Sequence, residues 1–244
     1  VYMTTDRVNH FLFEDYERDG EYKEEFLEFY RKVDRYLGEM RELLPDDVTM
    51  VVASDHGFTT LNYEVHCNEW LAQNDWLSYE DDDHDELGDI AEDTKAYSLI
   101  PGRFYINLED REPRGSVPED EYEAVRDELQ AELEALEGPD GNKVADRVVT
   151  REDAFRGDHD DIAPDLVVVP NHGFDLKSGF KGDDDVFGKG PRNGMHSFDN
   201  ACLFVDDPDA RIEDADLLDI APTLMDLLDI EYDRTAFDGS TLLS

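Results

Sequence analysis

The sequence has few cysteines, no long apolar segment and no recognisable signal peptide. Its two cysteines, Cys67 and Cys202, cannot form a disulfide framework, so we expect two free thiols inside a cell. No apolar stretch approaches the ~18 residues that a membrane-spanning helix requires. The sequence therefore predicts a cytoplasmic protein that has no membrane partner.

Positive charge is also scarce. The 244 residues include 22 Lys and Arg, of which only seven are lysines, against 64 Asp and Glu, and the formal net charge is −42. A field of this sign repels phosphate backbones, which excludes general nucleic-acid binding through a basic face. The acidic residues run through segments with apolar periodicity, which excludes a disordered acidic tail. The composition favours a protein of a salt-adapted organism, because concentrated salt screens self-repulsion, and an acidic mesophilic protein is the alternative.

The apolar residues of the chain form a pattern that predicts α-helices and β-strands around a core. The length of 244 residues suits one large α/β domain or two small ones, and the hydrophobic fraction of 39% argues against a disordered chain. A short β-prone start at 1–4 precedes apolar residues at helical spacing between Phe26 and Leu44, and Pro45 stops this helix. The apolar run 48–53 is typical of a strand buried in a parallel sheet. A strand, a helix and a second strand predict a right-handed crossover.

The remaining chain predicts an insertion into this pattern. Residues 61–160 contain an acidic loop, a strand and a helix introduced by Pro118, and we interpret them as an inserted, cap-like subdomain. Residues 1–60 and 161–244 then form the α/β core. Within the second part we expect strands at 165–169 and 201–205, a loop at 173–194, and a helix that Asp219 caps and whose leucines face the core.

Three short stretches concentrate Asp and His near predicted strand ends. Asp6 and His10 are four residues apart on a predicted helix, so they share one face. Asp55 and His56 follow the apolar run, where Gly57 permits a bend, and His196 precedes a strand. Carboxylate and imidazole are ligands that Zn²⁺ and similar ions favour. Five ligands are too many for one tetrahedral site and too few for two, which indicates two metals with one site incompletely filled; surface His and Asp are the alternative for each pair taken alone.

Other polar residues are weaker candidates. His172 follows a predicted strand and could line a pocket. The 173–194 loop holds a cluster of cations that includes Lys189 and Arg192, which could bind or guide a substrate phosphate, although offsetting local acids explains them equally well. Phe58, Met195 and Phe198 are expected to be packing residues.

In order along the chain, five stretches resemble the type I phosphodiesterase/nucleotide pyrophosphatase family of the alkaline phosphatase superfamily. They are TTDRVNH at 4–10, SDHGF at 54–58, APDLVVV at 163–169, GMHSFDN at 194–200 and DIAPTLMDLL at 219–228. The resemblance implies an alkaline-phosphatase-like, mostly parallel sheet flanked by helices. It also implies two divalent metal ions, usually zinc with manganese possible, and a small phosphorylated substrate.

By position in that family, Asp6, His10 and His196 would hold one ion, and Asp55 and His56 would help to hold the other. The family completes the second site with an Asp and a Thr or Ser nucleophile, which forms a covalent phospho-enzyme intermediate. Thr4, Thr5 and Ser54 do not match that nucleophile. We therefore expect no nucleophile in this chain, and a partner in the form of an upstream segment or a second chain, without which the chain is inactive.

A second departure is the Ser197-Phe198 pair, where many relatives carry Gly-Tyr. The resemblance favours hydrolysis of phosphodiester or nucleotide pyrophosphate bonds. Two alternatives stay open. One is a phosphomonoesterase, phosphonate hydrolase or phosphomutase of the same superfamily, and the other is a non-catalytic metal-binding fragment.

Overall fold

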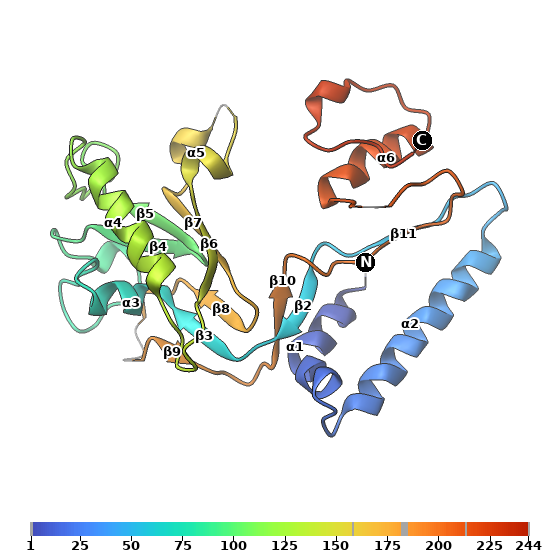
Figure 1. Cartoon of the computed structure of the whole chain (residues 1–244), viewed down its shortest axis with the longest axis horizontal. Helices are drawn as coiled ribbons and strands as arrows, with labels where there is room; N and C mark the ends of the chain where they lie inside the picture. Colours follow the sequence, from blue (N-terminus) through green and yellow to red (C-terminus); the bar gives the residue numbers. More distant parts are fainter. Residues whose placement is uncertain (1, 158, 182–184, 213, 244) are drawn as a thin grey trace. The chain divides into compact units, whose positions relative to one another are not determined.

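The chain divides into two compact units in the computed structural model, which describes residues 2–157, 159–181, 185–212 and 214–243 (Figure 1). The first unit comprises Val1–Thr59 and Gly194–Ser244, and the second comprises Thr60–Asn193. The predicted insertion, 61–160, thus lies within the second unit, which continues to Asn193. No helix in the described ranges has both the length and the apolar character that a bilayer-spanning segment needs.

The first unit combines helices with two small sheets. Its elements are α1 (Met3–Glu17), α2 (Lys23–Leu43), β1 (Val51–Ala53), β2 (Gly57–Thr60), β10 (Gly194–Ser197), β11 (Leu203–Val205) and α6 (Ile220–Leu227). Strand β1 pairs antiparallel with β11, and β2 pairs with β10. The last residue of β2, Thr60, is assigned to the second unit.

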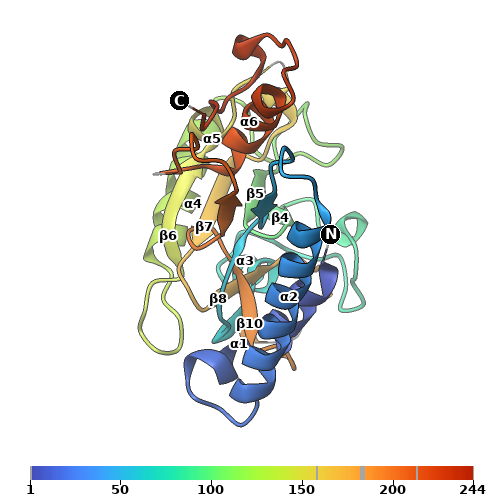
Figure 2. The same cartoon turned by 90° about the vertical axis from the view of Figure 1, so that its right-hand side faces the viewer.

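The start of the chain is helical, so the predicted strand at 1–4 is wrong. Met3 begins α1, and the Thr5 hydroxyl donates a hydrogen bond to the Tyr2 carbonyl at 2.6 Å. Four β-prone residues are a weak signal, and here α1 packs instead against α2 and β10 (Figure 2). Without the first strand there is no strand–helix–strand crossover, whereas the predicted helix between Phe26 and Leu44 is confirmed as α2.

Aromatic side chains hold α1 against α2. The buried ring of Phe26 stacks on Tyr16 with centroids 4.9 Å apart and meets Phe13 edge to face at 6.2 Å. The Tyr30 hydroxyl donates to the Asn9 side-chain oxygen at 2.7 Å. These contacts fix the part of α1 that carries residues 6–10.

The second unit contains two sheets and the main apolar core. Its elements are β3 (Tyr63–His66), α3 (Cys67–Gln73), β4 (Ala96–Ile100), β5 (Arg103–Ile106), α4 (Tyr122–Ala135), β6 (Ala145–Thr150), α5 (Arg151–Ala154), β7 (Leu166–Pro170), β8 (Phe174–Lys177) and β9 (Phe187–Gly188). One sheet has the antiparallel order β4-β5-β7-β6, with α4 packed against it. In the other, β3 lies between β8, which is parallel to it, and β9, which is antiparallel.

A buried carboxylate ties the elements of the four-stranded sheet together. Asp165, fully buried just before β7, receives two hydrogen bonds from the Arg111 guanidinium, at 2.8 and 2.7 Å. It also accepts from the Tyr122 hydroxyl and from the Ile106 backbone N–H, each at 2.7 Å. Because every donor comes from a different segment, this cluster fixes their register without needing a ligand.

The α/β class predicted from the sequence is confirmed, but the described residues contain several small, mostly antiparallel sheets and no large parallel one. The run 48–53 forms only the three-residue β1, which pairs antiparallel with β11. The predicted loop at 173–194 is also wrong in part, because it contains β8 and β9. Its Gly, Lys and Asp content hid the alternation of buried Phe174 and Leu176 with half-buried Asp175 and Lys177.

Candidate metal centre

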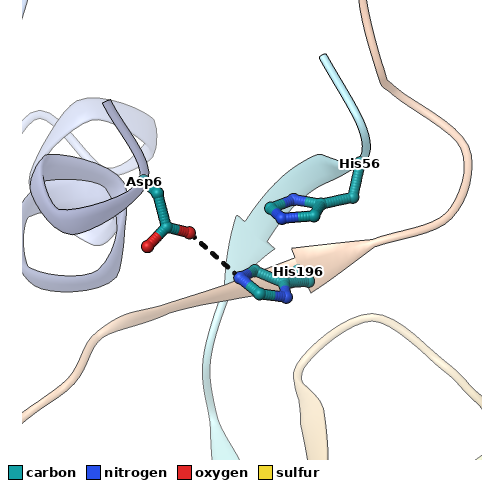
Figure 3. Close-up of side chains that lie close together, drawn as sticks. All are labelled: Asp6, His56 and His196. Atoms are coloured by element: carbon teal, nitrogen blue, oxygen red, sulfur yellow. Dashed lines mark hydrogen bonds and ion pairs between the residues drawn. The ribbon is translucent and has the colours of Figure 1, made fainter. Parts of the chain in front are cut away.

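Side chains from three separate stretches of the first unit meet at one place. Asp6 comes from α1, His56 precedes β2, and His196 lies on β10 (Figure 3). Each offers a ligand atom, and these three atoms lie within 4.8 Å of one another. The Asp6 carboxylate is 3.1 Å from Nε2 of His196 and 3.6 Å from Nε2 of His10. Three of the five predicted ligands, Asp6, His56 and His196, thus form one group, and His10 lies beside Asp6.

A close approach of α1 to β10 places Asp6 and His10. The two residues are one helical turn apart, so both face β10. A Cβ atom on Gly194 would lie 2.2 Å from the Asn9 carbonyl oxygen, so only glycine permits this approach. In return, the Gly194 carbonyl accepts a hydrogen bond from Nδ1 of His10 at 2.8 Å.

The bend between β1 and β2 places Asp55 and His56. Nδ1 of His56 donates to the Gly57 carbonyl at 3.1 Å. The Asp55 carboxylate lies 3.6 Å from Nε2 of His56, but its side chain is 83% exposed. Asp55 is thus next to the cluster without belonging to the group of three.

These hydrogen bonds select the histidine tautomer. A carbonyl oxygen only accepts, so Nδ1 carries the proton in His10 and His56, which leaves Nε2 as the free lone pair. In both residues that Nε2 faces a carboxylate oxygen 3.6 Å away. Imidazole nitrogens and carboxylate oxygens are both groups that bind divalent cations, so the chemistry of this group of side chains fits such an ion.

The buried ring of Phe58 supports the three imidazoles. Its centroid lies 5.1 Å from those of His10 and His196, both edge to face, and 5.6 Å from that of His56. The rings of His56 and His196 stack with centroids 3.7 Å apart. Phe58 and Met195 are buried, as expected for packing residues, whereas the Phe198 prediction is wrong because that residue is 75% exposed.

The electrostatics of the cluster favour a neutral His196. Burial is the main cause that lowers its pKa, and the neighbouring His56 and His10 act in the same direction. The hydrogen bond to Asp6 opposes them but does not reverse the shift. The neutral imidazole is the form that binds a metal ion.

The grouping differs from the one that the resemblance implies. His56, assigned by resemblance to a second ion with Asp55, lies here with Asp6 and His196. The division of the five residues between two ions stays a prediction. Sequence reasoning assigned no role to Asn200, whose side chain joins the segments that carry His56 and His196. The one available signal was its place four residues after His196.

The predicted substrate residues His172, Lys189 and Arg192 all belong to the second unit. Arg192 forms ion pairs with Glu64 at 2.7 Å and with Asp175 at 3.1 Å. Burial alone would raise the pKa of Glu64, but the hydrogen bond from Arg192 and the charge of Lys177 outweigh it and lower this pKa. Arg192 thus offsets local acids, and a role of the three residues toward a substrate stays a prediction.

One comparison with known proteins gives a match. The family model for type I phosphodiesterase / nucleotide pyrophosphatase matches residues 1–199, a range that contains all five predicted ligands. No curated protein and no solved structure shows a significant match to the chain.

Proposed function

The chain belongs to the type I phosphodiesterase/nucleotide pyrophosphatase family, and on this premise we propose that it hydrolyses phosphodiester or nucleotide pyrophosphate bonds with the help of divalent cations. Members of this family are hydrolytic phosphodiesterases and are typically metal-dependent. The observation that carries the proposal is the meeting of Asp6, His56 and His196 within 4.8 Å, although they lie up to 190 residues apart in the chain.

The chain's own residues bind and orient in this proposal. Asp6, His10 and His196 hold one cation and Asp55 and His56 help to hold a second, with Nδ1 of His10 and of His56 tied to backbone carbonyls. When bound, such cations withdraw charge from the attacking and leaving oxygens at phosphorus. Zinc is the first candidate and manganese the second, because imidazole and carboxylate ligands suit both.

The attacking group in the proposal is a Thr or Ser hydroxyl. Thr4, Thr5 and Ser54 do not match the position of the family's nucleophile, so we assign the attack to none of them. The substrate is a small phosphorylated molecule. His172, Lys189 and Arg192 are the residues of this chain that we propose contact or guide its phosphate.

Hydrolysis of bis-p-nitrophenyl phosphate tests the proposal. The protein produced from its complete gene is stripped with a chelator and then supplied with Zn²⁺ or Mn²⁺. We expect metal-dependent release of nitrophenol from the diester, with less from p-nitrophenyl phosphate. Asp6→Asn and His196→Ala should abolish it, whereas His159→Ala, which changes an exposed histidine of the second unit, should not. A stripped enzyme of undiminished activity would contradict the proposal, and so would one inactive with both metals.

A further inference from the structure

We infer that Asn200 is a positioning residue that sets the separation of His56 and His196, an inference that rests on the proposed function. The carboxamide of Asn200 holds the Phe58 backbone at both of its polar groups. Its side-chain oxygen accepts from the Phe58 N–H at 2.9 Å, and its side-chain nitrogen donates to the Phe58 carbonyl at 2.7 Å. Phe58 follows His56 by two residues and supports all three imidazoles.

The same carboxamide reaches the other histidine-bearing segment. The Ser197 hydroxyl donates to the Asn200 side-chain oxygen at 2.5 Å, and Ser197 directly follows His196. One side chain thus connects the residue next to His196 with the residue that follows His56 by two. We call Asn200, Ser197 and the Phe58 backbone the carboxamide clamp.

The carboxamide clamp explains why residue 57 is a glycine. A Cβ atom on Gly57 would lie 1.5 Å from the Asn200 side-chain oxygen and 2.7 Å from the Ser197 hydroxyl oxygen. Gly57 lies in β2 and has no positive φ, so no special backbone conformation requires glycine there. The bend that we expected Gly57 to permit falls at Asp55 and His56 instead. Glycine is needed because the carboxamide occupies the space of its side chain.

A similar clamp in the second unit provides a matched control. The Asn68 side chain accepts from the Ser98 N–H at 2.7 Å and donates to the Ser98 carbonyl at 2.9 Å. Both asparagines therefore hold the two backbone groups of one residue, but Asn68 is buried and belongs to the second unit, whereas Asn200 as a residue is exposed and belongs to the first. Asn200→Ala opens no buried cavity, so we expect the variant to fold.

Two readouts test the inference in the protein made from its complete gene. The first is the ring ¹⁵N spectrum of the histidines in metal-free protein. Asn200→Ala should move the signals of His56 and His196 and leave that of His172 in the second unit in place. The second is Co²⁺ affinity, followed by visible absorption, which should fall about 10- to 100-fold, as is usual when a group that orients a ligand is removed.

The controls separate positioning from general destabilisation. Asn68→Ala should lower thermal stability without changing Co²⁺ affinity or the signals of His56 and His196. Equal losses of Co²⁺ affinity in Asn200→Ala and Asn68→Ala would overturn the inference. Unchanged imidazole signals of His56 and His196 in Asn200→Ala would overturn it as well. Should Asn200→Ala fail to fold, Ser197→Ala is the deciding variant. It removes one hydrogen bond of the clamp, so its Co²⁺ affinity should fall about 2- to 12-fold. If wild-type protein binds no Co²⁺ and hydrolyses no diester, the proposed function fails, while the metal-free spectra still decide on the clamp.

Discussion

The two units are stabilised in different ways. The apolar core of the second unit includes Phe104, Leu129 and Leu166, each at most 2% exposed, and it continues into β3 and β8. In the first unit the buried apolar side chains among the described residues are few: Phe26, Phe58, Met195, Val205, Pro222 and Leu242. The candidate metal centre lies in the unit with the smaller core.

Polar contacts and close backbone approaches take the place of a large core around that centre. Gly194 lets α1 approach β10, and Gly57 leaves room for the Asn200 carboxamide. Such contacts fix positions with little burial of apolar surface, so a substitution that removes one of them should disturb the site more than the apolar core. Stability and cation binding should therefore respond to different substitutions.

Phe104→Ala should have the largest effect on stability. Phe104 is 2% exposed on β5, and an aromatic-to-alanine change at such a site removes about 3–5 kcal/mol from the free energy of unfolding. Urea denaturation measures this loss. Leu224→Ala on α6, where the side chain is 40% exposed, should stay within about 0.5 kcal/mol. Co²⁺ affinity of folded Phe104→Ala should equal that of wild type; a parallel loss of binding would contradict the separation of the two units.

Gly57→Ala should have the next largest effect, and its effect should depend on Asn200. The added methyl group overlaps the carboxamide, and overpacking of this kind costs about 1–3 kcal/mol. In an Asn200→Ala background most of that cost should disappear, because the atom that is 1.5 Å away is gone. Thermal denaturation of the two single variants and the double variant gives the coupling. Additive effects would mean that the carboxamide does not occupy this space.

Local sequence patterns selected the residues of the candidate site, and their role as metal ligands stays a prediction. Asp6 and His10 needed only helical spacing, and Asp55 and His56 needed only their place after an apolar run. His196 was grouped with them by its residue type, by its place beside a predicted strand and by the resemblance, because no local pattern connects residues 190 positions apart. The position of Asn200 in the clamp could not be predicted for the same reason, because Phe58, the residue whose backbone it holds, lies 142 positions away on β2.

The wrong predictions of the fold have local causes. Residues 1–4 are β-prone, but a short segment takes the structure that its neighbours stabilise, and α2 and β10 stabilise a helix. On α6 the helical period predicted buried leucines, yet Leu224 and Leu228 are exposed, and Pro222 and Thr223 are the buried residues. Periodicity gives the face of a helix but not the presence of a partner for that face.

Glu64→Gln should change how the second unit responds to acid. The folded-state pKa of Glu64 is lowered, so the unfolded chain takes up a proton first as the pH falls. The ion pairs of Glu64 thus contribute stability fully above its ordinary pKa of 4.5, and this contribution is lost as the pH falls through the lower folded-state value. Denaturation measured from pH 7 downward should show that wild type has a higher free energy of unfolding than Glu64→Gln. This difference should shrink below about pH 4.5. Exposed Glu92→Gln is the control, and an advantage independent of pH would exclude the ion pairs as its cause.

Arg192→Ala and Lys189→Ala should have the smallest effects, on KM for a diester substrate. If the loop cations guide the substrate phosphate, removal of one of these charges weakens binding by about 0.2–1 kcal/mol, or roughly a 1.4- to 5-fold rise in KM at constant kcat. Lys32→Ala, which removes an exposed cation from α2, should leave KM unchanged. Arg192 forms ion pairs with Glu64 and Asp175, so its loss should also lower the stability of the second unit. If that structural role is its only one, KM should stay at the wild-type value. If KM is unchanged in both loop variants, these cations only stabilise the second unit. Phosphate binding would then depend on the metal centre alone.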